Sequence, residues 1–357
     1  MELRSRGHEV IAGDVELYAL DRWITAGLTF SPDRRRWHTK YRLAPVAFER
    51  RSRNASRRIA ARLPGVDVIL QVGATFEPLR HGATPYALFC DSNIRLAMEG
   101  AASGYGEAVS LSSDELRAVE AREAAVYHGA AVIFTLSEHT RQSFIRDFSI
   151  RPERVSAVYG GPNFDVREVA DEASRQSARP PTVLFVGRQF ERKGGDLLLQ
   201  AFRQARRSVP NAELLIVGPQ QVGSSEAGVR SLGFLHKERP GDWALLAEAY
   251  RSADVFCLPT RFEPFGIVFI EAMHFGLPCI GTNVWAVPEI IADGETGFIV
   301  PPEDVNQLAD CLVRLLRDRE LARRMGAAGR ARALRMFTWS AAVERMLVTL
   351  DAVIGPA

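Results

Sequence analysis

Short apolar runs alternate with longer amphipathic stretches along the whole chain. Runs of about four to eight apolar residues are typical of buried parallel strands, and longer stretches with apolar residues every three or four positions are typical of helices that cover a sheet. In the first half the predicted strands are 8–12, 66–72, 86–90, 131–135 and 155–159, and the predicted helices are 41–63, 113–128 and 137–148. This alternation predicts an α/β fold with parallel sheets.

The second half repeats the alternation more regularly. Its predicted strands are 182–187, 213–217, 231–235, 254–258 and 279–280, and its predicted helices are 195–207, 242–251 and one between the turn at 264–266 and Gly276. Further elements are 287–292, 298–300, 305–316 and 320–337, followed by an amphipathic helix from Thr338.

Residues 160–181 are rich in Gly, Pro, Ser and charged residues, which is typical of an interdomain linker. We therefore predict an N-terminal domain at 1–165, a linker at 166–181, a C-terminal domain at 182–337 and a C-terminal helix at 338–357 that could pack on the N-terminal domain. Both domains are predicted as doubly wound parallel sheets, with the ligand where their carboxyl ends face each other.

Composition is that of a soluble globular protein, with 46% hydrophobic and 25% charged residues among 357. No apolar run approaches the roughly 18 residues of a membrane-spanning helix, and the first ten residues contain no apolar signal region. We therefore expect a cytoplasmic protein. The four cysteines are far apart and lack metal-ligand spacing, which favours buried reduced thiols and indicates no metal site.

Charge is distributed unevenly, although the net charge is only +2. Residues 1–62 contain 14 Lys and Arg against 7 Asp and Glu, concentrated at 34–36, 50–53 and 57–58. Such a region could bring the protein to the inner face of an anionic membrane or to an acidic acceptor. A solvated Arg-rich helix is the simpler interpretation. Because aromatic residues are not interleaved with these arginines, nucleic-acid binding is not predicted.

The most informative stretch is 263–281. Glu263 and Glu271 are separated by seven residues, and a Pro-Phe-Gly turn between them opens an apolar helix after a buried strand. The start of such a helix offers backbone N–H groups and a positive dipole end, which suit a phosphate. Glu271 stands amid apolar residues without a packing reason, so ligand hydroxyls could donate to it. An ordinary α/β crossover with a surface glutamate at each end is the alternative.

A second phosphate signal, the segment Gly-Arg-x4-Lys-Gly-Gly at 187–195, also follows a predicted strand and precedes a helix. Arg188 and Lys193 would project from this turn and suit a diphosphate. The segment is neither a Walker loop nor a dinucleotide fingerprint, and a charged surface loop is the alternative. Because the chain has no Asp-x-Asp pair, we expect these cations and the helix start at 265–267 to neutralise the diphosphate without a metal ion.

Together these segments resemble glycosyltransferase family 4, the retaining nucleotide-sugar-dependent enzymes of the GT-B fold. The resemblance covers most of the second half, at 187–194, 215–219, 233–235, 253–259, 263–271 and 287–301, and the first half only loosely, at 6–10, 137–138 and 158–165. It implies two Rossmann-like domains facing a central cleft. It also implies that the N-terminal domain lacks its first strand and the Gly-rich turn after it.

The resemblance further implies a donor site made of Gly187, Arg188, Lys193, Gly218, Phe234, Leu235, Glu263, Phe265, Gly266, Ile267 and Glu271. Arg188 and Lys193 would hold the diphosphate, and Glu271 would accept hydrogen bonds from ribose hydroxyls. Glu263 would lie beside the transferred hexose, while Gly218 and 234–235 would border the base. The family has no agreed nucleophile, so catalysis would be mainly electrostatic stabilisation of the leaving diphosphate, together with positioning.

Asp91 stands where many members of this family have a histidine that faces the sugar. A carboxylate there could accept from a sugar hydroxyl or stabilise positive charge at the anomeric carbon, which makes Asp91 a candidate catalytic residue beside Glu263, Arg188 and Lys193. A cap on a helix that begins at Ile94 is an equally consistent role.

We therefore expect a retaining hexosyltransferase, active in a pathway such as polysaccharide biosynthesis, that needs no metal or cofactor. Its donor would be a UDP or GDP sugar, and its acceptor a hydroxyl of a glycan, a lipid-linked or a small molecule. The alternative is a degenerate relative that binds nucleotide-sugar or a partner without turnover, which the missing first strand favours. A phosphorylase would need a pyridoxal-phosphate lysine, and 176–357 contains only Lys193 and Lys237.

Overall fold

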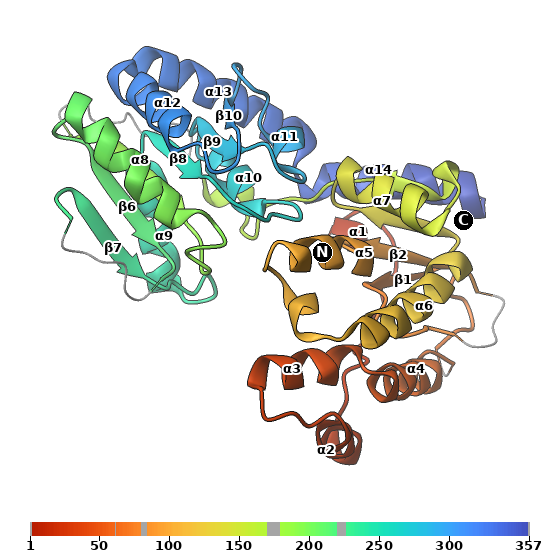
Figure 1. Cartoon of the computed structure of the whole chain (residues 1–357). Helices are drawn as coiled ribbons and strands as arrows, with labels where there is room; N and C mark the ends of the chain where they lie inside the picture. Colours follow the sequence, from red (N-terminus) through yellow and green to blue (C-terminus); the bar gives the residue numbers. More distant parts are fainter. Residues whose placement is uncertain (1, 61, 80–83, 170–178, 220–225, 356–357) are drawn as a thin grey trace. The chain divides into compact units, whose positions relative to one another are not determined.

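The computed structural model describes residues 2–60, 62–79, 84–169, 179–219 and 226–355. Most of the predicted linker at 166–181 lies outside these ranges. The chain divides into two compact units (Figure 1): unit 1 consists of Met1–Tyr159 and Val343–Ala357, and unit 2 of Gly160–Ala342. In this division, 160–165 lies in unit 2, and most of the C-terminal helix lies in unit 1.

Unit 1 is built on a parallel sheet of β1 (Ile69–Val72), β2 (Tyr86–Cys90), β3 (Val132–Thr135) and β4 (Val155–Ala157), in that order. Its helices are α1 (Glu2–Ser5), α2 (Ala19–Leu28), α3 (Arg34–Leu43), α4 (Pro45–Ala60), α5 (Ile94–Ala102), α6 (Ser113–Gly129), α7 (Glu138–Phe148) and most of α14 (Trp339–Ile354).

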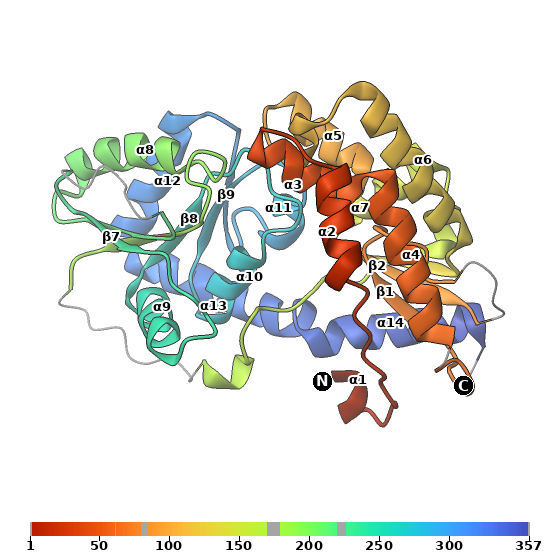
Figure 2. The same cartoon turned by 90° about the horizontal axis from the view of Figure 1, so that it is seen from below.

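Both faces of this sheet are covered by apolar side chains. On one side, Tyr127 of α6 and Phe144 of α7 belong to a buried cluster with Leu88 and Ile133 of the sheet. On the other side, Met346 of α14 joins a second buried cluster with residues of β2 and β3 (Figure 2). The four strands predicted between residues 66 and 159 are therefore confirmed, with ends that differ by a few residues.

Two predictions for the first half are wrong. Residues 8–12 do not form a strand, because no strand lies beside them and the carbonyl oxygen of Val10 accepts from the Arg4 side chain instead. The predicted helix 41–63 is two helices, α3 and α4. Ala44 is extended between them, with φ −64° and ψ 151°, because the following proline disfavours helical backbone at this position.

Unit 2 contains the parallel strands β5 (Thr182–Val186), β6 (Glu213–Val217), β7 (Val229–Gly233), β8 (Val255–Leu258), β9 (Cys279–Thr282) and β10 (Gly297–Val300). Its helices are α8 (Gly195–Ser208), α9 (Pro240–Ser252), α10 (Ile267–His274), α11 (Val287–Ile290), α12 (Val305–Arg317) and α13 (Arg319–Met336). The strand order is β10-β9-β8-β5-β6-β7. Chain order therefore reverses between β5 and β8, the switch point at which doubly wound sheets bind ligands.

Two glycines allow the loops at this switch point to pack closely. Gly194 has φ +72°, and a Cβ there would lie 1.9 Å from the carbonyl oxygen of Pro259. Gly218 has φ +129°, and its Cβ would lie 2.3 Å from the carbonyl oxygen of Gly187. L-residues rarely adopt such backbone angles. The loops after β5, β6 and β8 therefore touch through their backbones.

Candidate functional site

A cavity of about 1070 Å³ opens in unit 2 at the carboxyl ends of β5, β6 and β7. Its lining residues come from the ends of these strands, the loops after them, α9, α10 and one position ahead of β5: Asn163, Val186, Gly187, Arg188, Lys193, Val217, Gly218, Pro219, Phe234, Leu235, His236, Lys237, Glu238, Leu246 and Val268. Six predicted donor-site residues are among them: Gly187, Arg188, Lys193, Gly218, Phe234 and Leu235. The other five, Glu263, Phe265, Gly266, Ile267 and Glu271, are not among the lining residues.

Lys193 and Glu263 form an ion pair beside the cavity. They meet because Lys193 follows β5, Glu263 follows β8, and these strands are neighbours in the sheet. Both side chains are nearly buried, 12% and 8% exposed. Burial lowers the pKa of the Lys193 ammonium, and the adjacent Glu263 carboxylate opposes that shift. The cation predicted to hold a diphosphate thus lines the cavity and pairs with Glu263, the first of the two glutamates that the sequence singled out.

Glu271 is completely buried on α10 and has three protein donors. Oε1 accepts from the Lys237 ammonium and, at 3.3 Å, from the Asn163 backbone N–H. Oε2 accepts at 3.2 Å from the Tyr250 hydroxyl. The sequence suggested that ligand hydroxyls would supply these donors. Instead, the carboxylate is already satisfied, and it reaches the cavity through Lys237 and Asn163, which line it.

Arg188 and the segment after β7 form one wall of the cavity. The Arg188 guanidinium lies over the Phe234 ring, 5.6 Å from its centroid, and the His236 ring meets Phe234 edge-on at 4.7 Å. Arg188 is exposed and forms no ion pair with any residue that the structure describes. Its charge is therefore available to an anion in the cavity.

The turn that opens α10 lies against the same cavity. Phe265 and Gly266 are buried, Ile267 is the first helical residue, and Val268 after it lines the cavity. The first N–H groups of a helix have no partner inside the helix. The positive end of α10 is thus placed at the cavity wall, as predicted from the Pro-Phe-Gly turn.

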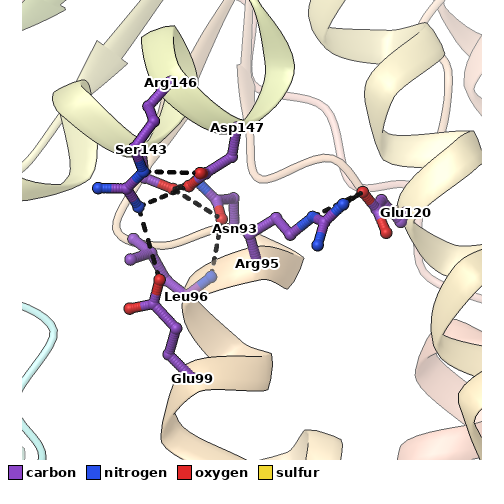
Figure 3. Close-up of polar contacts among 8 residues, drawn as sticks. All are labelled: Asn93, Arg95, Leu96, Glu99, Glu120, Ser143, Arg146 and Asp147. Carbon is purple, nitrogen blue, oxygen red and sulfur yellow. Dashed lines mark hydrogen bonds and ion pairs between the residues drawn. The ribbon is translucent and has the colours of Figure 1, made fainter.

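Asp91 lies exposed in unit 1, directly after β2. It does not cap α5, because the Asn93 side chain does so by accepting from the Leu96 N–H at 3.0 Å (Figure 3). Asn93 also donates to Ser143 of α7 at 3.0 Å, which ties the start of α5 to the middle of α7. The capping alternative for Asp91 is therefore wrong, and its catalytic role stays a prediction.

Sequence reasoning missed Asn163, His236, Lys237 and Glu238 as cavity residues. Lys237 could have been noticed, since the only two lysines of 176–357 each pair with one of the two motif glutamates. Asn163 could not, because its position depends on the next residue: the Phe164 ring packs against Trp243, His274 and Phe275 at centroid distances of 5.1–6.1 Å.

All four cysteines are free thiols, and three of them are buried. Within the described ranges no group of three or more His, Cys, Asp or Glu side chains is arranged to hold a metal ion. In the same ranges, no helix combines the length and apolar character that crossing a bilayer requires.

Residues 166–332 match the model of the family described as Glycosyl transferases group 1. The chain is 38% identical over 202 residues to a phosphatidyl-myo-inositol mannosyltransferase of Mycobacterium leprae, which covers 55% of this chain and 53% of that protein. It is 32% identical over 244 residues to a GDP-mannose-dependent alpha-(1-6)-phosphatidylinositol monomannoside mannosyltransferase of Mycobacterium tuberculosis, 61% of each protein. The chain thus spans about half to three fifths of the length of these relatives.

Among solved structures, the chain is similar to sucrose-phosphate synthase from Thermosynechococcus elongatus, with a TM-score of 0.66 and 22% identity over 87% of this chain and 82% of that one. With the two parallel sheets, this likeness confirms the predicted fold class, GT-B.

Proposed function

We propose that the chain, whose residues 166–332 match the model of the glycosyl transferases group 1 family, is a retaining hexosyltransferase. It moves a hexose from a nucleotide-diphosphate sugar to a hydroxyl acceptor and uses no metal ion. The acceptor is a glycan, a lipid-linked or a small molecule. Relatives named for mannose transfer make GDP-mannose the first donor to test.

The observation that carries this proposal is the convergence of three positive groups on one cavity. Arg188 and Lys193 come from the loop after β5, the start of α10 follows β8, and these two strands are neighbours at the switch point of the unit 2 sheet. An arginine fork, a lysine and a helix N-terminus are the groups that proteins use to hold phosphate oxygens. At about 1070 Å³ the cavity has room for a nucleotide sugar.

The same groups supply the chemistry. In the transfer, the bond between the anomeric carbon and the diphosphate oxygen breaks, and a bond from that carbon to the acceptor oxygen forms on the same face. The acceptor proton passes to the leaving diphosphate. Negative charge grows on this diphosphate in the transition state, where Arg188 and Lys193 stabilise it without reorganisation. Glu263, held beside Lys193, would orient the hexose.

A thermal-shift panel of UDP-, GDP- and ADP-sugars tests the binding part, because a ligand that binds the folded state raises its melting temperature. The donor found is then incubated with acceptors and excess EDTA, and the anomeric configuration of the product is read by NMR. A retained configuration with EDTA present supports the proposal. Inversion, or a strict need for a metal, contradicts it. Binding without transfer to any acceptor would favour the degenerate relative.

A further inference from the structure

Large exposed apolar side chains cluster at one place in unit 1. Of the sixteen in the described residues, six fall within residues 11–30. Four of these lie on α2 or just after it: Leu20 is 71%, Trp23 76%, Leu28 66% and Phe30 64% exposed. Leu20, Trp23 and Leu28 fall on the same side of the helix. We call these four residues the α2 apolar surface.

The inward side of α2 holds no large buried apolar residue: Thr25 is the one buried residue of the helix, and Ile24 and Ala26 are half-buried. Thr29, just after the helix, is also buried, and Asp21 forms an ion pair with Arg50 of α4. The buried Thr25 hydroxyl has no hydrogen-bond partner among the described residues. A surface helix of a globular protein normally turns its apolar side inward. In α2, Leu20, Trp23 and Leu28 are exposed instead, and the helix lies on the outside of α3 and α4 (Figure 1).

Positive charge accompanies the α2 apolar surface. Arg22 is on α2 itself, and Arg34 and Arg35 begin α3 four residues after Phe30. All three are exposed, and none forms an ion pair within the part of the chain that the structure describes. A tryptophan and leucines beside arginines are the composition of helices that lie in the headgroup region of a bilayer.

We propose that the α2 apolar surface docks on a bilayer of acidic lipids. Leu20, Trp23 and Leu28 enter the headgroup boundary, and the nearby arginines meet lipid phosphates. A second copy of the chain is a less suitable partner for the α2 apolar surface. A two-fold contact through this surface would bring the unpaired arginines of both copies together, whereas an anionic bilayer neutralises them. This docking is independent of sugar transfer in unit 2.

The test is co-sedimentation of the full chain with vesicles of phosphatidylcholine alone and of phosphatidylcholine mixed with phosphatidylglycerol. The protein should bind the mixed vesicles at low salt and the neutral ones weakly. Leu20→Ser with Trp23→Ser should weaken binding at least about tenfold. The matched control, Leu334→Ser with Val348→Ser, removes side chains of similar exposure elsewhere and should leave binding unchanged.

A second pair of variants tests the charge. Arg34→Gln with Arg35→Gln should weaken binding by about fivefold for each arginine removed, while Arg323→Gln with Arg324→Gln, exposed on α13, should change it little. This pair keeps the proposal testable if the serine variants do not fold. The proposal is overturned if the wild type does not bind the acidic vesicles, or if the variants and their controls weaken this binding equally. It is also overturned if the α2 apolar surface instead drives dimerisation measured by analytical ultracentrifugation.

Discussion

The Lys193–Glu263 ion pair gives opposite predictions for its two members. In the empty cavity the ammonium is neutralised by Glu263. A diphosphate that reaches Lys193 must compete with this carboxylate. Lys193→Met removes the cation that the phosphate needs, whereas Glu263→Gln frees it. We therefore expect the first variant to weaken nucleoside diphosphate binding and the second to leave it intact or strengthen it.

The magnitudes follow from burial. A hydrogen bond to a charged group contributes about 1.5–3 kcal/mol, so Lys193→Met should weaken affinity about ten- to hundredfold. Removing one member of a buried pair usually costs about 3–5 kcal/mol of stability. In Lys193→Met the Arg192 guanidinium still interacts electrostatically with Glu263. We therefore expect this variant to lose stability at the lower end of that range.

Isothermal titration calorimetry with GDP and UDP measures the affinities, and turnover of the donor is measured in parallel. Glu263→Gln should lower kcat much more than it changes donor affinity, because we propose that Glu263 orients the reacting sugar. Lys40→Met is the matched control, since it breaks a lysine–glutamate pair with Glu115 in unit 1 and should not affect nucleotide binding. If Glu263→Gln weakens GDP or UDP binding as much as Lys193→Met does, the reasoning is wrong.

Two further predictions concern stability, and a third concerns ligand binding. Burial raises the pKa of Glu123 to about 7 from 4.5. The stability that the protonated Glu123 carboxyl contributes to the fold is therefore complete below about pH 4.5 and is lost as pH rises through 7. A glutamine at this position can still accept from Ile94 and Tyr127. The free energy of unfolding of Glu123→Gln, measured with urea, should therefore exceed that of the wild type by about 1–3 kcal/mol at pH 8 but not at pH 4. Lys237→Met should lower the melting temperature by stranding the buried Glu271 carboxylate, and adding Glu271→Gln should restore most of the loss; equal melting of both variants would contradict this. Gly194→Ala should abolish nucleoside diphosphate binding seen by thermal shift, because its Cβ has no room beside Pro259.

Much of unit 2 could be predicted from the sequence. Apart from the edge strand β7, its strands are mostly buried and bounded by glycines and prolines, so their apolar runs are short and distinct. The meeting of Lys193 and Glu263 also follows from the sequence, because residues after the first and fourth strands of a doubly wound sheet lie side by side at its switch point.

Other features depend on tertiary context that the sequence does not display. β7 was predicted two residues too late, at 231–235 instead of Val229–Gly233, and its pairing with β6 shifts register near Val217. This shift places Phe234 to Glu238 in a loop that lines the cavity. Residues 8–12 have strand-like composition, but a strand also needs a neighbour, and no strand among the described residues pairs with them.

The central claim is that a nucleoside diphosphate lies in the unit 2 cavity, between Arg188, Lys193 and the start of α10. A crystal structure of the protein with GDP or UDP tests it most directly. We predict diphosphate oxygens within hydrogen-bond distance of both cations, with the Lys193–Glu263 pair opened. A nucleotide bound elsewhere, or one whose phosphates point away from Lys193 into solvent, would contradict the account.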